Sequence, residues 1–216
     1  MSPRARSSED ILAAARARRD RRAEVTDSDV VMDAAAAFLA VRPRSEAETR
    51  RRLLHLGYPA ALCDSVVGRL TELGYLDDRA FARAWVESRD RARPRGSLAL
   101  RRELQQKGVP GQTIDEVLAD RAGTAAGQTV TRARAVVAGA ADAMVDPGTR
   151  AAGVEEMAAR RLLERRASSL RREDDPRKRR QKAYALLARH GFPPDVCLAV
   201  AAAFGVPDPD GADEGV

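Results

Sequence analysis

A short pattern of residues occurs three times along the chain and limits the folds that it can adopt. Each copy has a leucine four residues before a glycine, then an apolar residue and a proline: Leu53 to Pro59, Leu104 to Pro110 and Leu187 to Pro193. A glycine just past an apolar helical segment ends the helix, because it adopts a left-handed conformation that a Cβ would penalise. Proline two residues later suits the first turn of the next helix. Each copy therefore predicts a helix, a tight turn and a second helix.

The likeness continues beyond each turn glycine. The sixth and ninth residues after it are apolar or cysteine in all three copies: Cys63 and Val66, Ile114 and Val117, Cys197 and Val200. These two offsets lie on one face of a helix. Agreement at several offsets in three places predicts a true internal repeat.

A further helix is expected at the start of each repeat. In the first repeat, Asp29 is the predicted cap of a helix whose apolar stripe runs from Val31 to Leu39. In the second, Asp77 is the predicted cap of a helix that carries Phe81 and Trp85. Each repeat therefore contains three helices.

The link from the first to the second helix has the same form in two repeats, Arg42-Pro43-Arg44-Ser45 and Arg93-Pro94-Arg95-Gly96. In the first link, Ser45 followed by Glu48 makes a capping box. The second helix of the first repeat is therefore predicted to begin at this serine.

The third repeat is less regular. Its glycine follows the second by 191 − 108 = 83 residues, whereas the first two are 108 − 57 = 51 apart, so about thirty residues near Arg121 to Arg150 are extra. Alanine, glycine and threonine dominate this stretch, and Asp146-Pro147-Gly148 interrupts a weak helical pattern, which predicts a partly helical insertion. A helix from about Val154 to Leu170 is then expected to open the third repeat.

The predicted fold is all-α, with three tandem three-helix repeats that form an elongated, curved array with disordered termini. Aromatic residues make up only 4% of the chain and leave few large strand formers. The expected boundaries are a disordered tail over 1–28, repeats over 29–76, 77–122 and 151–205, the insertion over 123–150 and a second disordered tail over 206–216.

The charge balance and the lack of long apolar runs limit the functions that the chain can have. Lysine and arginine number 38 against 32 acidic residues, a net charge of +6 that permits a polyanionic partner without requiring one. No apolar run approaches the roughly 18 residues of a membrane span, and the N-terminus lacks the apolar segment of a signal peptide. We therefore expect a cytoplasmic protein with no membrane partner. Cys63 and Cys197 fall in apolar helical patterns and are expected to be reduced core thiols.

No pattern typical of catalysis, of a metal site or of a cofactor is found. His55 with Cys63 and His190 with Cys197 each supply two ligands across a turn, whereas zinc needs about four. Neither a catalytic triad beside a glycine-containing elbow nor a phosphate-binding glycine loop is present. We therefore expect a protein that is not an enzyme, with no metal and no cofactor.

The acidic pair and the aromatic residues are interpreted as structural. Asp77-Asp78 follows an apolar residue and is typical of a helix start rather than of a general acid–base pair. Tyr75, Phe81 and Trp85 could stack on bases, but in a chain with eight aromatic residues the core has first claim on them.

Basic clusters recur in the second helices of the repeats, and an array can join such clusters into a continuous stripe. Arginine offers a fixed fork to phosphate or carboxylate, so the stripe is a candidate contact surface for a partner. A solvated helix face is the alternative. The candidate contact residues are Arg50, Arg51, Arg52, Arg95, Arg101, Arg102, Lys107, Lys178, Arg179, Arg180 and Lys182.

Several strings together carry a family resemblance. They are Arg42-Pro43-Arg44-Ser45 with Leu53 and Gly57, Gly74-Tyr75-Leu76-Asp77-Asp78 followed by Phe81-Ala82, Arg95-Gly96 with Leu104, Lys107 and Gly108, and Tyr184 through Gly191-Phe192 to Val200. From about Ala34 to Phe204 the chain thereby resembles the regulatory protein RecX family. It departs from the family pattern in its long N-terminal tail and in the insertion before the third repeat.

The resemblance implies tandem three-helix repeats and a function. RecX-like proteins bind the filament of the RecA recombinase and modulate, mostly inhibit, its ATP-driven strand exchange and co-protease activities. The implied partners are therefore the RecA filament and single-stranded DNA, contacted directly or within the filament, and we expect a monomer. The alternative is a stand-alone DNA-binding protein whose helix-turn-helix-like units act by occupancy.

Overall fold

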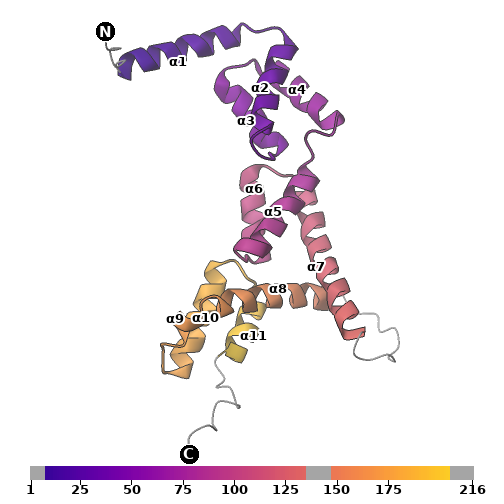
Figure 1. Cartoon of the computed structure of the whole chain (residues 1–216), viewed down its shortest axis with the longest axis vertical. Coiled ribbons are helices and arrows are strands. Elements are labelled where there is room, and N and C mark those ends of the chain that lie inside the picture. Colours follow the sequence, from indigo (N-terminus) through magenta and orange to yellow (C-terminus); the bar gives the residue numbers. More distant parts are fainter. Residues whose placement is uncertain (1–7, 135–146, 205–216) are drawn as a thin grey trace, which may run out of the picture. The chain divides into compact units, whose positions relative to one another are not determined.

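The computed structural model describes residues 8–134 and 147–204, and within these ranges every regular element is a helix (Figure 1). The helices are α1 (Ser8–Ala23), α2 (Ser28–Leu39), α3 (Glu46–Leu56), α4 (Ala60–Glu72), α5 (Asp78–Ala92), α6 (Ser97–Lys107), α7 (Gly111–Arg134), α8 (Pro147–Glu164), α9 (Ala167–Leu170), α10 (Pro176–Arg189) and α11 (Pro194–Phe204). The all-α prediction is confirmed. None of the helices in these ranges combines the length and apolar character that a membrane crossing needs.

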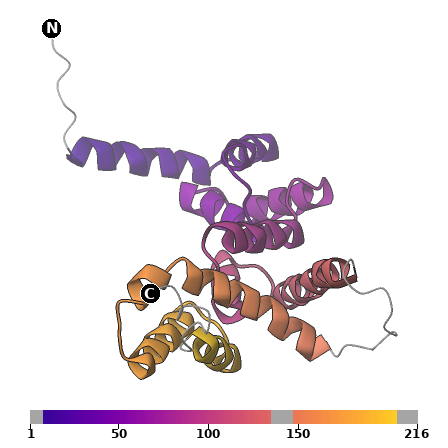
Figure 2. The same ribbon diagram turned by 60° about the horizontal axis from the view of Figure 1, so that its bottom comes forward.

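The helices group as the repeat pattern predicts. Helices α2 to α4 form the first repeat and α5 to α7 the second, while α8, α10 and α11 form the third, with the short α9 between its first two helices. The chain divides into two compact units, one of residues up to Phe81 with Lys107–Pro110, the other of Ala82–Gln106 with the residues from Gly111 onward. In the second unit, Figures 1 and 2 both show α8 lying across α10 and α11.

All three turn glycines adopt the predicted left-handed conformation. The φ angles are +104° at Gly57, +83° at Gly108 and +78° at Gly191. The leucine four residues earlier is fully buried in each repeat, and so is the sixth residue after the glycine; these residues are Leu53, Leu104, Leu187, Cys63, Ile114 and Cys197. The repeat pattern therefore identifies both the turns and the core positions that close on them.

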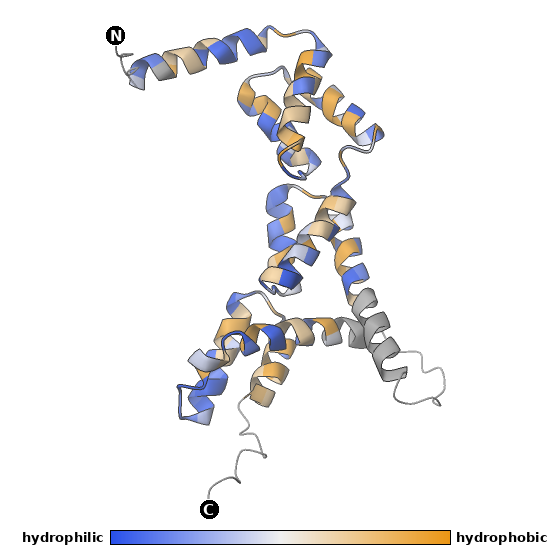
Figure 3. Cartoon of the chain, viewed as in Figure 1, coloured by the Kyte–Doolittle hydropathy of each residue, from blue (hydrophilic) through white to orange (hydrophobic). Residues whose placement is uncertain are grey.

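Each compact unit has its own apolar core. In the first, α2, α3 and α4 bury a cluster that contains Val31, Leu53, Cys63 and Leu70. In the second, α8, α10 and α11 bury a cluster around Leu163. Figure 3 shows hydrophobic residues recurring along these helices, with hydrophilic residues between them. This spacing is typical of helices that bury one face and expose the other.

Two of the three predicted caps are confirmed. Ser45 Oγ accepts a hydrogen bond from the Glu48 N–H at 3.1 Å, and Asp77 Oδ1 accepts from the backbone N–H groups of Arg79 and Ala80. The predicted cap at Asp29 is wrong. The cap is Asp27, whose Oδ1 accepts the Asp29 N–H at 2.9 Å, so Asp29 lies in the first helical turn.

The stretch before the first repeat differs from the expectation of disorder, because α1 occupies most of it. Alanine and arginine are strong helix formers, which accounts for a helix without an apolar face. At its end, the Arg22 side chain donates to the Leu56 carbonyl at 3.4 Å, and its guanidinium lies 5.6 Å from the centroid of the Tyr58 ring.

The insertion and the start of the third repeat also differ in detail. Helix α7 does not end with the second repeat but continues to Arg134, and α8 begins at Pro147 rather than near Val154. The expected helix to Leu170 is divided, because α8 ends at Glu164 and α9 follows. Residues 135–146 of the predicted insertion lie outside the described residues.

Consecutive repeats meet at a joint that has the same form twice. The carbonyl just before a turn glycine accepts a hydrogen bond from the start of the preceding repeat's second helix: Lys107 O accepts from Ser45 Oγ at 2.6 Å, and His190 O from the Gly96 N–H at 3.1 Å. The turn glycine itself packs so closely that an added Cβ would overlap a side chain, that of Ala47 at Gly108 and that of Ala99 at Gly191.

A carboxylate from the following repeat completes each joint. Asp78, the first residue of α5, accepts the Glu46 N–H at the start of α3 at 3.0 Å. Glu155 of α8 likewise accepts the Ser97 N–H at the start of α6 at 2.9 Å. The second helices of the first two repeats thus each receive an N-terminal cap from the following repeat, which satisfies a backbone donor that their own residues leave free.

Candidate functional site

The predicted basic clusters lie on second helices, as expected, but many of their cations are engaged within the protein. Arg50 forms a two-pronged ion pair with Asp64 of α4, and the equivalent Arg101 pairs with Asp115 of α7. In both repeats the arginine and the aspartate are fourteen residues apart, so this pair is a repeated tie between the second and third helices.

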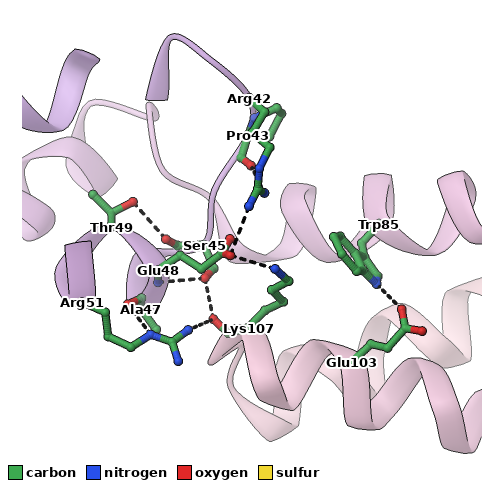
Figure 4. A network of polar contacts seen from close by, with 10 residues as sticks. All are labelled: Arg42, Pro43, Ser45, Ala47, Glu48, Thr49, Arg51, Trp85, Glu103 and Lys107. Atoms are coloured by element: carbon green, nitrogen blue, oxygen red, sulfur yellow. Dashed lines mark hydrogen bonds and ion pairs between the residues drawn. The ribbon is translucent and has the colours of Figure 1, made fainter. Parts of the chain in front are cut away.

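Arg51 and Lys107 belong to the joint between the first two repeats (Figure 4). Lys107 Nζ contacts Glu48 Oε1 at 2.8 Å, and the Arg51 guanidinium donates to the Lys107 carbonyl at 3.2 Å. Burial acts to raise the pKa of Glu48, but the hydrogen bond and charge of Lys107, with the charge of Arg42, hold it below its usual value. The primary role of Lys107 is therefore structural, as the ion-pair partner of Glu48.

Glu103 of α6 gathers the polar side chains of the second repeat. It accepts from Trp85 Nε1 at 2.8 Å, shown in Figure 4, and from Arg89 Nε at 2.7 Å, and it lies 3.7 Å from Arg95 Nε. The Arg89 guanidinium also covers the Trp85 ring at 4.4 Å. Arg95 and Trp85 are therefore both held by contacts inside this repeat.

The third cluster does not occupy the position of the other two. Arg50 and Arg101 each lie seven residues before their turn glycine, whereas Arg180 lies eleven before Gly191. The cluster is therefore nearer the start of its helix, where Asp175 is the cap and Pro176 is the first residue. The second helices do not carry their charge at one equivalent location.

Within that cluster, two cations are tied to the loop before α10. Arg179 donates to the Glu173 and Asp174 carbonyls, and Lys182 pairs with the Glu173 carboxylate at 2.5 Å. Lys178 and Arg180 are exposed, and neither forms a hydrogen bond or a close ion pair with another described residue.

Four of the eleven candidates thus remain available to a partner. Arg102, Lys178 and Arg180 are exposed and form no close ion pair within the described part of the chain, and Arg52 contacts an aromatic ring, that of Phe38 at 5.8 Å. Sequence reasoning could not separate these four from the rest, because the carboxylates and carbonyls that engage the others are brought to them by the fold.

The two cysteines that were considered as metal ligands lie in the apolar core. Cys63 and Cys197 are buried free thiols that donate to the carbonyls of Tyr58 and Phe192, as the prediction of core thiols requires. Burial raises the pKa of both thiols. Among the described residues, no three His, Cys, Asp or Glu side chains converge as a metal site.

One aromatic residue departs from the expectation of a core position. Phe81 is buried and Trp85 is half-buried, but Tyr75 is 71% exposed. It follows Gly74, which has a φ of +74° in the turn after α4, and its neighbour Leu76 takes the buried position. The core prediction is therefore wrong for Tyr75.

The structure also reveals a buried ion pair that the sequence did not indicate. Arg121 of α7 contacts Glu155 Oε1 and Asp90 Oδ1, each at 2.8 Å, and the side chains of Arg121 and Glu155 are less than 10% exposed. Burial raises the pKa of Glu155 despite the opposing charge of Arg121. This pair fastens the third repeat's first helix to the second repeat.

Comparison with known proteins gives consistent matches along the chain. Family profiles match at three places: the first three-helix domain of RecX over residues 32–70, the second over 77–118 and the third over 155–200. A regulatory protein RecX of Mycolicibacterium vanbaalenii is 39% identical over 128 residues, which cover 58% of this chain and 67% of that protein. One of Chlorobium phaeobacteroides is 40% identical over 95 residues, which cover 44% of this chain and 63% of the relative. The matched stretch thus spans about two thirds of these relatives or slightly less.

Solved structures show the same fold. A crystal structure of regulatory protein RecX aligns with a TM-score of 0.59 over 94% of this chain and 81% of that one, at 18% identity. The crystal structure of RecX from Lactobacillus salivarius aligns with a TM-score of 0.57 over 82% of this chain and 96% of its own, at 16% identity.

Proposed function

Because the chain belongs to the RecX family of regulatory proteins, we propose that it binds the filament that RecA forms on DNA and modulates, mostly by inhibition, the recombinase's ATPase, strand exchange and co-protease activities. The observation that carries this proposal is the match of all three repeats to the family's three domains in their order. The protein would act in the cytoplasm, as a monomer, by occupying a surface of the filament rather than by chemistry of its own.

The cations without a close internal partner form the surface that would contact the filament. A filament on DNA presents phosphates and acidic side chains, and arginine binds both through the same planar fork. Arg102, Lys178 and Arg180 offer their charges without first breaking an internal ion pair. The paired residues Arg50, Arg101 and Lys107 would have to leave their carboxylates on binding, so we assign them to folding rather than to contact.

The test is ATP turnover by RecA of the same organism on single-stranded DNA, with increasing amounts of this protein. We expect turnover to fall and the isolated protein to hydrolyse no nucleotide. ATP hydrolysis that persists in homogeneous protein would contradict the assignment as a regulator, and unchanged recombinase turnover at saturating protein would contradict the proposed inhibition.

The contact surface is tested with the triple variant Arg102→Ala, Lys178→Ala and Arg180→Ala. These exposed charges contribute little to stability, so we expect an unchanged thermal midpoint and weaker filament binding. The matched control is Arg69→Ala, an exposed arginine on α4 that pairs with the neighbouring Glu72. Equal binding by the triple variant and the wild type would remove these residues from the surface. Strong binding to naked DNA with none to the filament would favour the stand-alone DNA-binding alternative.

A further inference from the structure

Two arginines of the first repeat share one aromatic ring. The guanidinium carbon of Arg44 lies 4.1 Å from the centroid of Phe38, and that of Arg52 lies 5.8 Å from it. Burial lowers the pKa of Arg44, and the charges of Arg42 and Arg52 lower it further, against the opposing charge of Glu48. Positive charge is therefore crowded at this place on the first repeat.

The second repeat differs from the first at two of these three positions. Fifty-one residues after Phe38, Arg44 and Arg52, at the spacing of the turn glycines, stand Arg89, Arg95 and Glu103. The Glu103 carboxylate accepts from Arg89 Nε at 2.7 Å and lies 3.7 Å from Arg95 Nε. The second repeat thus supplies its own anion where the first repeat has Arg52.

The first repeat has no equivalent anion within the described part of the chain. Arg44 Nε is buried without a hydrogen-bond partner, and Arg52 is exposed without an acidic or hydrogen-bonding one. Arg95 Nε is also buried and unbonded, but Glu103 is beside it. Glu48, whose charge acts on Arg44, contacts Lys107 at 2.8 Å and Arg42 at 3.4 Å through Oε1, while its buried Oε2 has no hydrogen-bond partner.

We propose that Arg44 and Arg52 bind a backbone phosphate of a nucleic-acid strand in the place that Glu103 fills in the second repeat. A phosphodiester has one negative charge and two free oxygens, so it can receive one guanidinium fork on each oxygen. Both guanidinium groups lie against the Phe38 ring, at 4.1 Å and 5.8 Å from its centroid, and the charge of Arg52 acts on Arg44. The site rests on the proposed function and deepens it by naming residues that meet the DNA strand, and it can be tested on DNA without the recombinase.

The test is the exchange that the repeat itself supplies, Arg52→Glu. Because the second repeat folds around a glutamate at this position, we expect the variant to fold with an unchanged helical signal. Binding of a fluorescent thymidine oligonucleotide is measured by anisotropy across a series of salt concentrations. We expect weaker binding and a log–log salt slope that is smaller by about 0.7 for each phosphate that the variant no longer neutralises.

Two further variants separate the site from net charge. Arg69→Glu makes the same charge change on the exposed face of α4 and should leave the salt slope at the wild-type value. Arg44→Gln removes the second guanidinium without adding a negative charge and should reduce the slope as Arg52→Glu does, which keeps the test decisive if one variant folds poorly.

Three outcomes would overturn the site. Wild-type affinity and slope in Arg52→Glu would mean that no phosphate binds there. An equal reduction in Arg69→Glu would show that only net charge matters. Weaker binding to the recombinase filament, with naked-DNA binding unchanged, would assign the pair to a protein carboxylate instead.

Discussion

At the scale of single residues, the turn glycines meet two separate requirements. Gly108 must adopt a positive φ, which a Cβ disfavours, and it must also leave room for Ala47 of α3. Gly74 has the first requirement alone, since its φ is +74° but nothing lies within 4 Å of an added Cβ. Gly68, inside α4, has neither.

This series predicts a graded response to alanine. Gly68→Ala should raise the free energy of unfolding by about 0.5 to 1 kcal/mol, because alanine is the better helix former. Gly74→Ala should lower it by about 1 kcal/mol through backbone strain alone. Gly108→Ala should lower it further, because Ala47 must also move. Urea unfolding of the three variants measures the order, and equal values for Gly74 and Gly108 would remove the close approach from the joint.

Asp78 predicts a pH dependence with a definite sign. Burial raises the pKa of Asp78 above its ordinary value of 3.8, with the Glu46 N–H acting against the shift. A raised pKa in the folded state means that this carboxyl's contribution to stability is fully present at low pH and is lost as the pH rises through the folded pKa. Asp64 behaves oppositely, because the hydrogen bond from Arg50 lowers its pKa, so its contribution is lost as the pH falls.

Carboxyl resonances followed by NMR during a pH titration should place the midpoint of Asp78 above that of Asp64. Asp78→Asn keeps an oxygen for the Glu46 N–H and should remove this part of the pH dependence. Asp78→Ala leaves that N–H without its acceptor and should cost about 1 kcal/mol. A midpoint for Asp78 at or below that of Asp64 would contradict the buried capping role.

At the scale of elements, α6 depends on a distant residue for its start. In the first repeat Ser45 caps its own helix, but Gly96 at the equivalent position has no side chain. The side-chain acceptor at the start of α6 is Glu155 of α8, which accepts the N–H of Ser97, as Asp78 accepts that of Glu46 in the first repeat, and is held there by Arg121. The same carboxylate therefore both caps α6 and pairs with α7.

The buried pair of Arg121 with Glu155 predicts a large loss of stability when Arg121 is replaced. Arg121→Met should lower the free energy of unfolding by about 3 to 5 kcal/mol, because Glu155 would be left as an unpaired buried charge. Arg160→Met, which breaks the exposed pair with Glu156 on α8, should cost less than about 1 kcal/mol. Adding Glu155→Gln to Arg121→Met should recover part of the stability. Equal costs for the two single variants would show that the Arg121 pair is not desolvated.

The elements differ in how well the sequence predicts them. The turns, the leucines before them and Cys63 follow from local chemistry repeated three times, so they are predictable. Helix α1 is not predicted, because its lack of large apolar residues indicates disorder, although its alanines and arginines favour a helix. The arginine-rich run from Arg16 to Arg22 is the sequence signal that could have indicated this helix.

For the whole molecule, the positions that resist prediction are those whose partners are distant in sequence. Glu155 meets a backbone group 58 residues away, and Asp78 meets one 32 residues away. The sequence alone shows which side chains are charged, but not which of those charges are neutralised by a partner in the fold. The contrast between Arg52 and Glu103 is the exception, since superposing the two repeats by their glycines exposes it.

The joints between consecutive repeats have a consequence for how such a chain can change in length. Each uses a main-chain carbonyl, a glycine, one small residue and a carboxylate of the following repeat that accepts a backbone N–H. A duplicated segment would therefore bring its own docking chemistry and would need no new matched pair of side chains. At the first repeat, Arg22 of α1 takes the equivalent carbonyl of Leu56, so that a plain helix stands where an earlier copy would otherwise attach.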